Sequence, residues 1–214
     1  MGLEWRDDEA RAHFLGLGLP ALDRLEDDLD EPRLAALGTR VTTALTRRLY
    51  LLDGGYYVKV QVARPGVLPP RKWVSYAAKP SPLLREARAY EVLSRLGFNT
   101  PPVLASGARG RFPLTVRAAL ITRELPDHVD VEQCPPERRH EAAAAVEQVV
   151  SRIHAAGYTL GKVAYRDFLV PREGPVDPES VVVIDAGGLA RGTRRRQRDI
   201  GALARERERS RLPG

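Results

Sequence analysis

The pattern of apolar and polar positions along the chain changes its period near Gly38. Leucines recur at helix-like intervals through residues 6–36, and Pro20 predicts that a new helix begins within that segment. After Gly38 the spacing becomes that of strands, which are predicted at residues 40–43, 47–52 and 56–62. Gly54 and Gly55 predict a hairpin turn before the last strand, because glycine tolerates the positive φ angles of tight turns. A helical segment followed by a three-stranded antiparallel meander is therefore expected.

Helices and short strands alternate in the remaining sequence. A proline-rich loop over residues 63–80 precedes a helix predicted at 83–96, for which Ser81 is a suitable N-cap and Gly97 a suitable end. The later elements are a strand at 117–123, a long helix at 139–156, and short apolar strands at 168–170 and 181–184. This order predicts an α+β fold.

Composition narrows the class of protein. The 214 residues suit one domain, or one domain with two lobes, and 43% of them are hydrophobic. A single cysteine, Cys134, cannot form an internal disulfide, which favours a reducing compartment. Neither a signal peptide nor a membrane-spanning stretch is expected. The sequence thus predicts a cytoplasmic location, with peripheral attachment at the inner membrane as an alternative.

Positive charge is concentrated at the end of the sequence. Residues 191–211 contain nine arginines and three acidic residues, within a net charge of +6. Such a run can bind phosphate groups on an anionic membrane surface, although a solvated terminal helix is the simpler interpretation. Binding to nucleic acid is not expected, because no aromatic residue is interleaved for base stacking.

One stretch resembles a known family. Residues 154–170 combine His154, Gly157 and Gly161 with Phe168-Leu169-Val170, and an apolar strand then ends at Asp185. This order is similar to that of the lipopolysaccharide core kinases, which phosphorylate Kdo or heptose and are distant relatives of protein kinases. The resemblance implies a small two-lobed protein-kinase-like fold of the α+β class. Its expected parts are a helical extension at 1–37, an N-lobe at 38–126, and a reduced C-lobe with the arginine-rich tail at 127–214.

The resemblance assigns cofactor-binding roles in the first lobe. Lys59 lies within a half-buried strand, and Glu86 lies near the start of the next helix. The resemblance implies that the two form an ion pair. Such a pair would hold the lysine where it orients the phosphates of ATP. A solvent-facing lysine with a surface glutamate is the other interpretation. Glu124 and Leu125 follow an apolar strand, where their backbone would face adenine.

Three residues of the second lobe carry the implied chemistry. Asp185 resembles the metal-binding Asp of the Asp-Phe-Gly motif, with Ala186 in place of Phe. When the strand at 168–170 sets the alignment, Lys162 stands where the family has its catalytic Asp, and Asp167 takes the second metal-ligand position. A rival alignment treats Tyr165-Arg166-Asp167 as a variant of His-Arg-Asp, with Asp167 as the base. His154 is expected to be structural and to bond a backbone carbonyl.

Two functions remain open from the sequence. The loss of the catalytic Asp favours a pseudokinase that binds ATP and Mg²⁺ with little or no phosphoryl transfer, and such a protein could act through a protein partner. The alternative is an active ATP-dependent kinase, with a hydroxyl of a lipopolysaccharide core sugar or of a protein as the acceptor.

Overall fold

A computed structural model describes residues 2–26, 29–43, 46–63, 80–111, 115–161 and 163–210. The chain forms two compact units, which are described separately below. Unit 1 comprises Met1–Ala87 and Pro102–Glu124, and unit 2 comprises Arg88–Pro101 and Leu125–Gly214. The fold class is α+β, as the sequence predicts.

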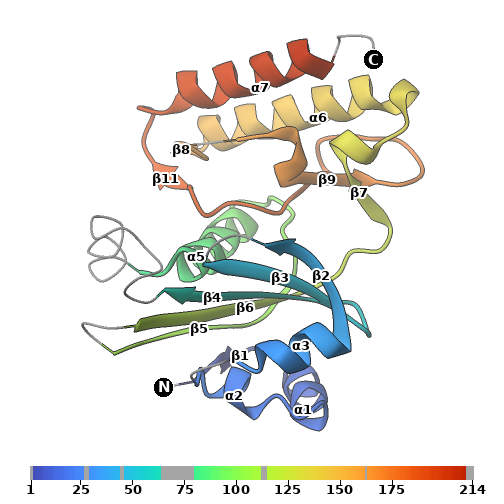
Figure 1. Cartoon of the computed structure of the whole chain (residues 1–214). Helices are drawn as coiled ribbons and strands as arrows, with labels where there is room; N and C mark the ends of the chain where they lie inside the picture. Colours follow the sequence, from blue (N-terminus) through green and yellow to red (C-terminus); the bar gives the residue numbers. More distant parts are fainter. Residues whose placement is uncertain are drawn as a thin grey trace. The chain divides into compact units, whose positions relative to one another are not determined.

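A six-stranded antiparallel sheet forms the centre of unit 1 (Figure 1). In sheet order its strands are β1 (Glu4–Trp5), β5 (Val103–Arg111), β6 (Thr115–Arg123), β4 (Tyr56–Ala63), β3 (Arg47–Leu52) and β2 (Gly38–Thr43). The predicted meander corresponds to β2, β3 and β4, which pair in sequence order. Gly54 and Gly55 both have positive φ angles in the turn before β4, as the sequence predicts. The meander therefore occupies one side of a larger sheet.

Short helices cover one face of this sheet: α1 (Asp8–Gly16), α2 (Pro20–Asp23) and α3 (Glu31–Leu37) (Figure 1). Phe14, Leu22 and Leu34 of these helices are buried in one core cluster with Tyr50, Tyr56 and Val58 of the strands. The Phe14 ring meets the Tyr56 ring edge-on, with centroids 5.2 Å apart, and lies 5.5 Å from the Trp5 ring. The N-terminal segment is thus part of the core of unit 1.

Helix α5 (Pro82–Arg95) begins and ends as the sequence predicts. The Ser81 hydroxyl oxygen accepts a hydrogen bond from the Leu84 backbone N–H at 3.2 Å, which satisfies a free donor at the helix start. Gly97, with a φ of +82°, reverses the chain just beyond the last turn. The first part of α5 belongs to unit 1 and the remainder to unit 2.

Two long helices run alongside each other in unit 2, namely α6 (Pro136–Ala155) and α7 (Arg196–Ser210) (Figure 1). A three-stranded sheet has the order β10 (Val182–Val183), β9 (Phe168–Pro171), β7 (His128–Asp130). Short 3₁₀ turns, η1 (Val131–Gln133) and η2 (Tyr165–Asp167), adjoin β7 and β9, and β8 (Tyr158–Thr159) pairs with β11 (Ala190–Arg191). Among the described residues, no helix is both long enough and apolar enough to cross a membrane.

Candidate functional site

Lys59 and Glu86 form an ion pair within unit 1. Lys59 lies in β4, where it pairs with Leu49 of β3 and Leu120 of β6, and Glu86 lies in the first part of α5. The glutamate side chain is 4% exposed and the lysine side chain 23% exposed, so the carboxylate depends more on a charged partner. The structure thus has the ion pair between Lys59 and Glu86, and not a solvent-facing lysine with a separate surface glutamate.

Gln61 is a polar residue of the same strand for which sequence reasoning gave no role. It lies two positions after Lys59, and alternation along a strand places both side chains on one face of the sheet. Its side chain is fully buried, and neither atom of its amide group has a hydrogen-bond partner in the described part of the chain. The sequence did contain a hint of this buried amide, because Gln61 stands between two valines in a predicted strand.

The peptide group that joins Glu124 to Leu125 follows β6. The Glu124 N–H donates to the Gly55 carbonyl at 2.8 Å, and the Leu125 carbonyl accepts from His128 at 3.0 Å. Within the residues described, the intervening Glu124 carbonyl and Leu125 N–H have no hydrogen-bond partner. These are the backbone groups that an adenine edge could use.

Asp167 ends η2, immediately before β9. Its carboxylate accepts a hydrogen bond from the Ala164 N–H at 2.8 Å, and its carbonyl accepts from the Ile184 N–H at 2.9 Å. Burial, followed by the negative charge of Asp185, raises the pKa of Asp167 to about 7. The two carboxylates that the sequence assigns to metal binding are therefore electrostatically coupled in unit 2.

Asp185 follows β10 and is exposed. The backbone just before it is fixed by Tyr90 of α5, whose hydroxyl donates to the Ile184 carbonyl. From the described residues, the Asp185 carboxylate itself accepts one long contact, of 3.5 Å from the Gly187 N–H. An exposed carboxylate beside a buried one leaves oxygen atoms available to a cation.

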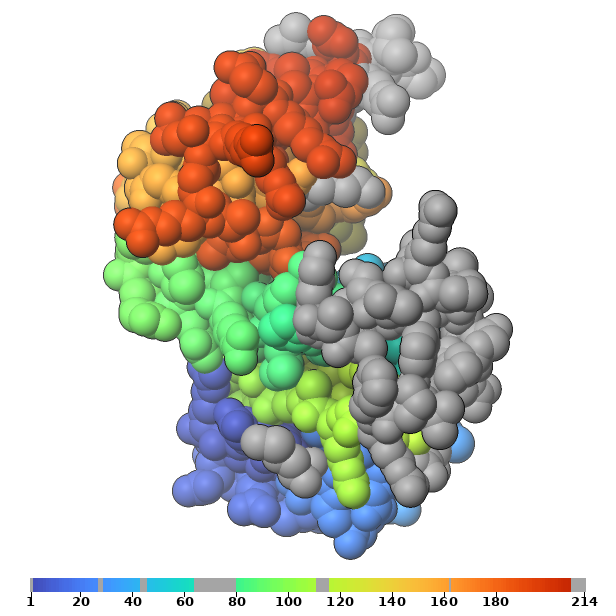
Figure 2. Space-filling model, turned by 90° about the vertical axis from the view of Figure 1, so that its left-hand side faces the viewer, coloured from blue at the N-terminus to red at the C-terminus, as the bar shows by residue number. Residues whose placement is uncertain are grey.

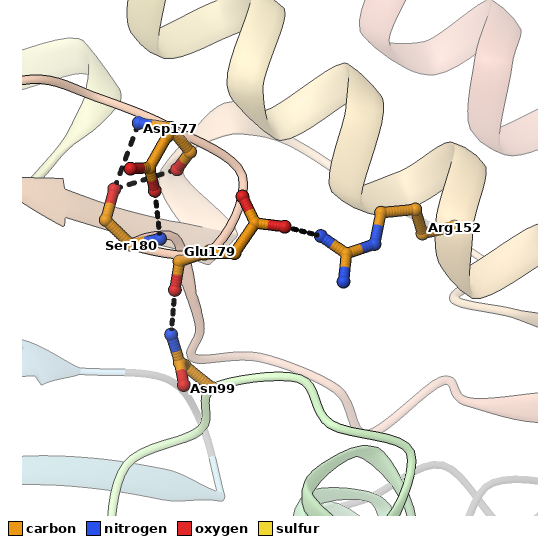
Figure 3. A network of polar contacts seen from close by, with 5 residues as sticks. All are labelled: Asn99, Arg152, Asp177, Glu179 and Ser180. Atoms are coloured by element: carbon orange, nitrogen blue, oxygen red, sulfur yellow. Dashed lines mark hydrogen bonds and ion pairs between the residues drawn. The ribbon is translucent and has the colours of Figure 1, made fainter.

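A polar network holds the turn between β9 and β10 (Figure 3). Arg152 of α6 pairs with the Glu179 carboxylate at 2.7 Å, and the Asn99 side-chain amide donates to the Glu179 carbonyl. Asp177 and Ser180 close the turn with mutual hydrogen bonds, including one of 2.7 Å from the Ser180 N–H. The turn that leads into β10 and Asp185 is thus attached to two other parts of unit 2.

A buried aspartate connects helix α7 to the loop before η2. Asp199 is fully buried, and its carboxylate lies 3.0 Å from His154 Nε2 and accepts the Leu160 N–H at 2.9 Å. The expectation that His154 bonds a backbone carbonyl through its side chain is therefore wrong. A carboxylate from a helix distant in sequence is its partner, which local spacing could not reveal.

Lys162 lies outside the residues that the structure describes, as does most of the proline-rich loop. On either side of it, Gly161 has a φ of +83° and Val163 is buried. The role expected for Lys162 therefore stays a prediction from the sequence.

The donor set formed by Asp167 and Asp185 fits Mg²⁺. Mg²⁺ is usually bound by one or two carboxylates together with phosphate oxygens and water, rather than by a complete protein cage. The described ranges contain no cluster of three or more His, Cys, Asp or Glu side chains able to hold a metal. A cation at this pair would also offset the repulsion that raises the pKa of Asp167.

The two units have the elements of a kinase-like fold, and comparison with solved structures agrees. The structure of WaaP in complex with acyl carrier protein matches with a TM-score of 0.61 and 23% identity, covering 96% of this chain and 81% of that one. Monomeric WbdD matches with a TM-score of 0.54 and 16% identity, covering 78% of this chain and 38% of that one. At these identities the likeness establishes the fold alone. A comparison with curated proteins found no match.

The family follows from the sequence profile. The model of the lipopolysaccharide kinase (Kdo/WaaP) family matches residues 53–213, about three quarters of the chain. The protein belongs to this family, and the resemblance expected from the sequence is confirmed. Kinase families generally use ATP and Mg²⁺.

Proposed function

We propose that the protein is a pseudokinase: it binds ATP with Mg²⁺ and transfers phosphate slowly or not at all. In this proposal Lys59, supported by Glu86, orients the phosphates, and Asp167 with Asp185 holds the metal ion. Mg²⁺ would supply charge neutralisation on the phosphate oxygens. The backbone groups of Glu124 and Leu125 would contact adenine. The proposed N-lobe (38–126, after the helical extension at 1–37) overlaps largely with unit 1, although its residues 88–101 and 125–126 fall in unit 2 with the proposed C-lobe.

The observation that carries nucleotide binding is the buried ion pair of Lys59 and Glu86. A buried ion pair is weak evidence for stability, because desolvation offsets much of the attraction. Its presence in the half-buried strand β4 is better explained by a functional need for the lysine. The coupled carboxylates of unit 2 provide independent support from the metal side.

The lack of transfer follows from the alignment that assigns Lys162 to the base position. In the pattern His-Arg-Asp-x-x-x-x-Asn the metal-binding residue lies five positions after the base, and Asp167 lies five positions after Lys162. Asp167 directly precedes β9 and is coupled to Asp185, which supports its assignment to the metal. A protonated lysine cannot accept the hydroxyl proton, and general-base catalysis typically contributes about 10²–10⁴-fold.

The decisive experiment measures ATP binding with and without Mg²⁺, followed by ATP turnover. We expect binding that Mg²⁺ strengthens, together with little or no turnover. Lys162→Asp should increase turnover by up to the same 10²–10⁴-fold if the rest of the machinery is intact. Lys59→Met should abolish binding in both backgrounds. Absence of any ATP binding by the natural sequence would reject the proposal.

An active kinase is the second candidate, and one observation favours it. A pKa near 7 is the value that suits a general base at neutral pH, and Asp167 has such a pKa. The rival alignment makes Asp167 this base, but it needs a metal ligand at Arg172. Arg172 instead donates from its Nε to the Pro126 carbonyl at 2.8 Å. Rapid turnover by the natural sequence, abolished by Asp167→Asn, would establish this candidate instead.

Partners follow from the surface and from one relative. Exposed arginines occur on β11, on α7 and between them: Arg191, Arg194, Arg195, Arg198 and Arg205. Their charge favours contact with an anionic membrane or lipopolysaccharide surface, and hence a cytoplasmic protein peripheral to the inner membrane. A protein partner is the other option for a pseudokinase, and WaaP was solved in complex with acyl carrier protein.

A further inference from the structure

A pocket of about 340 Å³ lies within unit 2, apart from the residues assigned above to nucleotide and metal. It is bordered by residues of η1, α6, η2 and α7. Its volume falls at the lower end of the range of about 300–1,000 Å³ typical of small-molecule sites. Tyr165, one of its lining residues, lies two positions before Asp167. A ligand in this pocket would therefore contact the same 3₁₀ turn that carries Asp167.

The pocket combines buried apolar surface with basic side chains. Val131, Ala143 and Tyr165 are buried lining residues, and the Tyr165 hydroxyl donates to the Glu147 carboxylate at 2.7 Å. The basic lining residues are Arg139, His140 and Arg207, and the acidic one is Glu132. A purely apolar ligand would desolvate the Arg139 guanidinium without compensation, which disfavours an acyl chain. A polar ligand with a negative charge matches the lining better.

Each arginine has a fixed contact, but only Arg139, which is exposed, keeps accessible donors in the described part of the chain. The Nε of Arg139 donates to the Cys134 carbonyl at 2.8 Å, and no further partner of its guanidinium is found in the described ranges. Arg207 pairs through one terminal nitrogen with both Glu147 oxygens, at 3.0 and 3.1 Å, and its buried Nε has no partner among the described residues. The terminal donors of Arg139, a lining residue of the pocket, can bind carboxylate or phosphate oxygens.

We propose that this pocket binds the carboxylate or phosphate group of a sugar-sized acidic ligand, with Arg139 as its principal contact. The inference rests on the proposed function in one respect, namely that the ligand is the acceptor-like molecule of a lipopolysaccharide kinase family member. Recognition of the acid group itself requires neither ATP nor Mg²⁺, because the lining residues are separate from those assigned to the nucleotide. Carboxylate and phosphate share the chemistry that the arginines offer, and the test distinguishes them.

The experiment uses the full chain without nucleotide and measures binding of glucuronate, glucose 6-phosphate and glucose by saturation-transfer NMR and calorimetry. At least one acidic sugar should bind at least about tenfold more tightly than glucose, because only it accepts charge-assisted hydrogen bonds. The preferred acid identifies the group recognised. Arg139→Gln should weaken that binding by about tenfold, whereas Arg95→Gln should leave it unchanged. Arg95 is a matched control, since it removes the same charge from an exposed position of α5 in unit 2.

Circular dichroism and thermal unfolding of each variant ensure that a loss of binding is not a loss of folding. Equal binding of glucose and both acids would overturn the inference, and so would unchanged affinity in Arg139→Gln. If neither acid binds while Mg²⁺–ATP does, the pocket assignment fails and the proposed function stands. If an acid binds through Arg139 while ATP does not bind, the pocket assignment stands and nucleotide binding fails.

Discussion

Asp167 holds a proton more tightly in the folded protein than an ordinary aspartic acid does, because burial and the Asp185 charge raise its pKa to about 7. The unfolded chain releases this proton near pH 4. Between about pH 4 and pH 7 the folded state therefore binds more protons, and the contribution of Asp167 to stability falls as the pH rises through 7. Asp167→Asn should remove this part of the pH dependence. Urea unfolding of the natural protein and of Asp167→Asn at pH 5, 6, 7 and 8 measures this pH dependence. Parallel profiles of unfolding free energy against pH for the two proteins would contradict the prediction.

The same pKa predicts how Mg²⁺ binding should depend on pH. A metal must displace the Asp167 proton below pH 7, so affinity should fall by about tenfold for each pH unit below that value and level off above it. Mg²⁺ titrations from pH 5.5 to 8.5 check this behaviour. In Asp167→Asn the affinity should be weaker and nearly independent of pH over the same range. A steep dependence that persists in this variant would assign the proton to another group.

The ion pair of Lys59 and Glu86 predicts unequal costs for its two halves. Lys59→Met takes the charged partner from a carboxylate that is only 4% exposed, and should cost about 3 kcal/mol of unfolding free energy. Glu86→Gln leaves an ammonium that is 23% exposed and better hydrated, so the cost should be about 1–2 kcal/mol. Glu26→Gln removes one partner of an exposed pair with Arg24 and should cost under about 0.5 kcal/mol. Urea denaturation ranks the three variants, and a reversed order of the first two would refute the argument.

The N-terminal helices belong to the core of unit 1, so changes in them should act as core mutations. Phe14 of α1 is 1% exposed and contacts the Trp5 and Tyr56 rings, whereas the adjacent Leu15 is 46% exposed. Phe14→Ala should therefore destabilise the protein by about 3–5 kcal/mol. Leu15→Ala in the same helix should change the stability by under about 0.5 kcal/mol. Thermal unfolding of both variants tests this, and similar small effects would show that the helices are not part of the core.

Elements whose signals are local could be predicted from the sequence, and contacts between distant segments could not. The start of α5 was predictable because Ser81 and Pro82 satisfy local backbone requirements, and β4 because its valines alternate. Strand β1 was not predicted, since two residues carry no periodicity and its partner β5 lies about a hundred residues later. The partner of His154 was missed for the same reason, because Asp199 belongs to a separate helix.

For the candidate site, too, some residues could be predicted from the sequence and others could not. The family resemblance had assigned roles to both residues of the Lys59–Glu86 pair and to both coupled carboxylates, Asp167 and Asp185. Neither the buried amide of Gln61 nor the pocket at Arg139 has a motif, because both depend on which side chains tertiary packing brings together. Family likeness therefore named residues that the structure pairs or couples, while burial and charge identified the additional candidates.

For the whole molecule, the distribution of arginines predicts binding to an anionic surface. Residues of β11 and α7 (orange to red in Figure 2) lie at the surface of unit 2, and Arg194, Arg198 and Arg205 are exposed. The other side of α7 is structural, because Leu203 is buried and Arg207 pairs with Glu147. Removing the helix would therefore disturb folding, and substituting exposed arginines is the sharper test.

Replacing Arg194, Arg198 and Arg205 together with glutamine should weaken binding to phosphatidylglycerol vesicles. Each arginine near an anionic surface contributes about 1 kcal/mol, so the triple variant should bind up to about a hundredfold more weakly. Raising the salt concentration should reduce this difference, since the Debye length shortens to about 3 Å at 1 M. A control with the same loss of charge replaces Arg11, Arg24 and Arg95, which are exposed on other helices or beside them. Vesicle co-sedimentation compares the two. Equal loss in both would show that net charge alone governs binding, and no loss in either would leave α7 as a solvated helix.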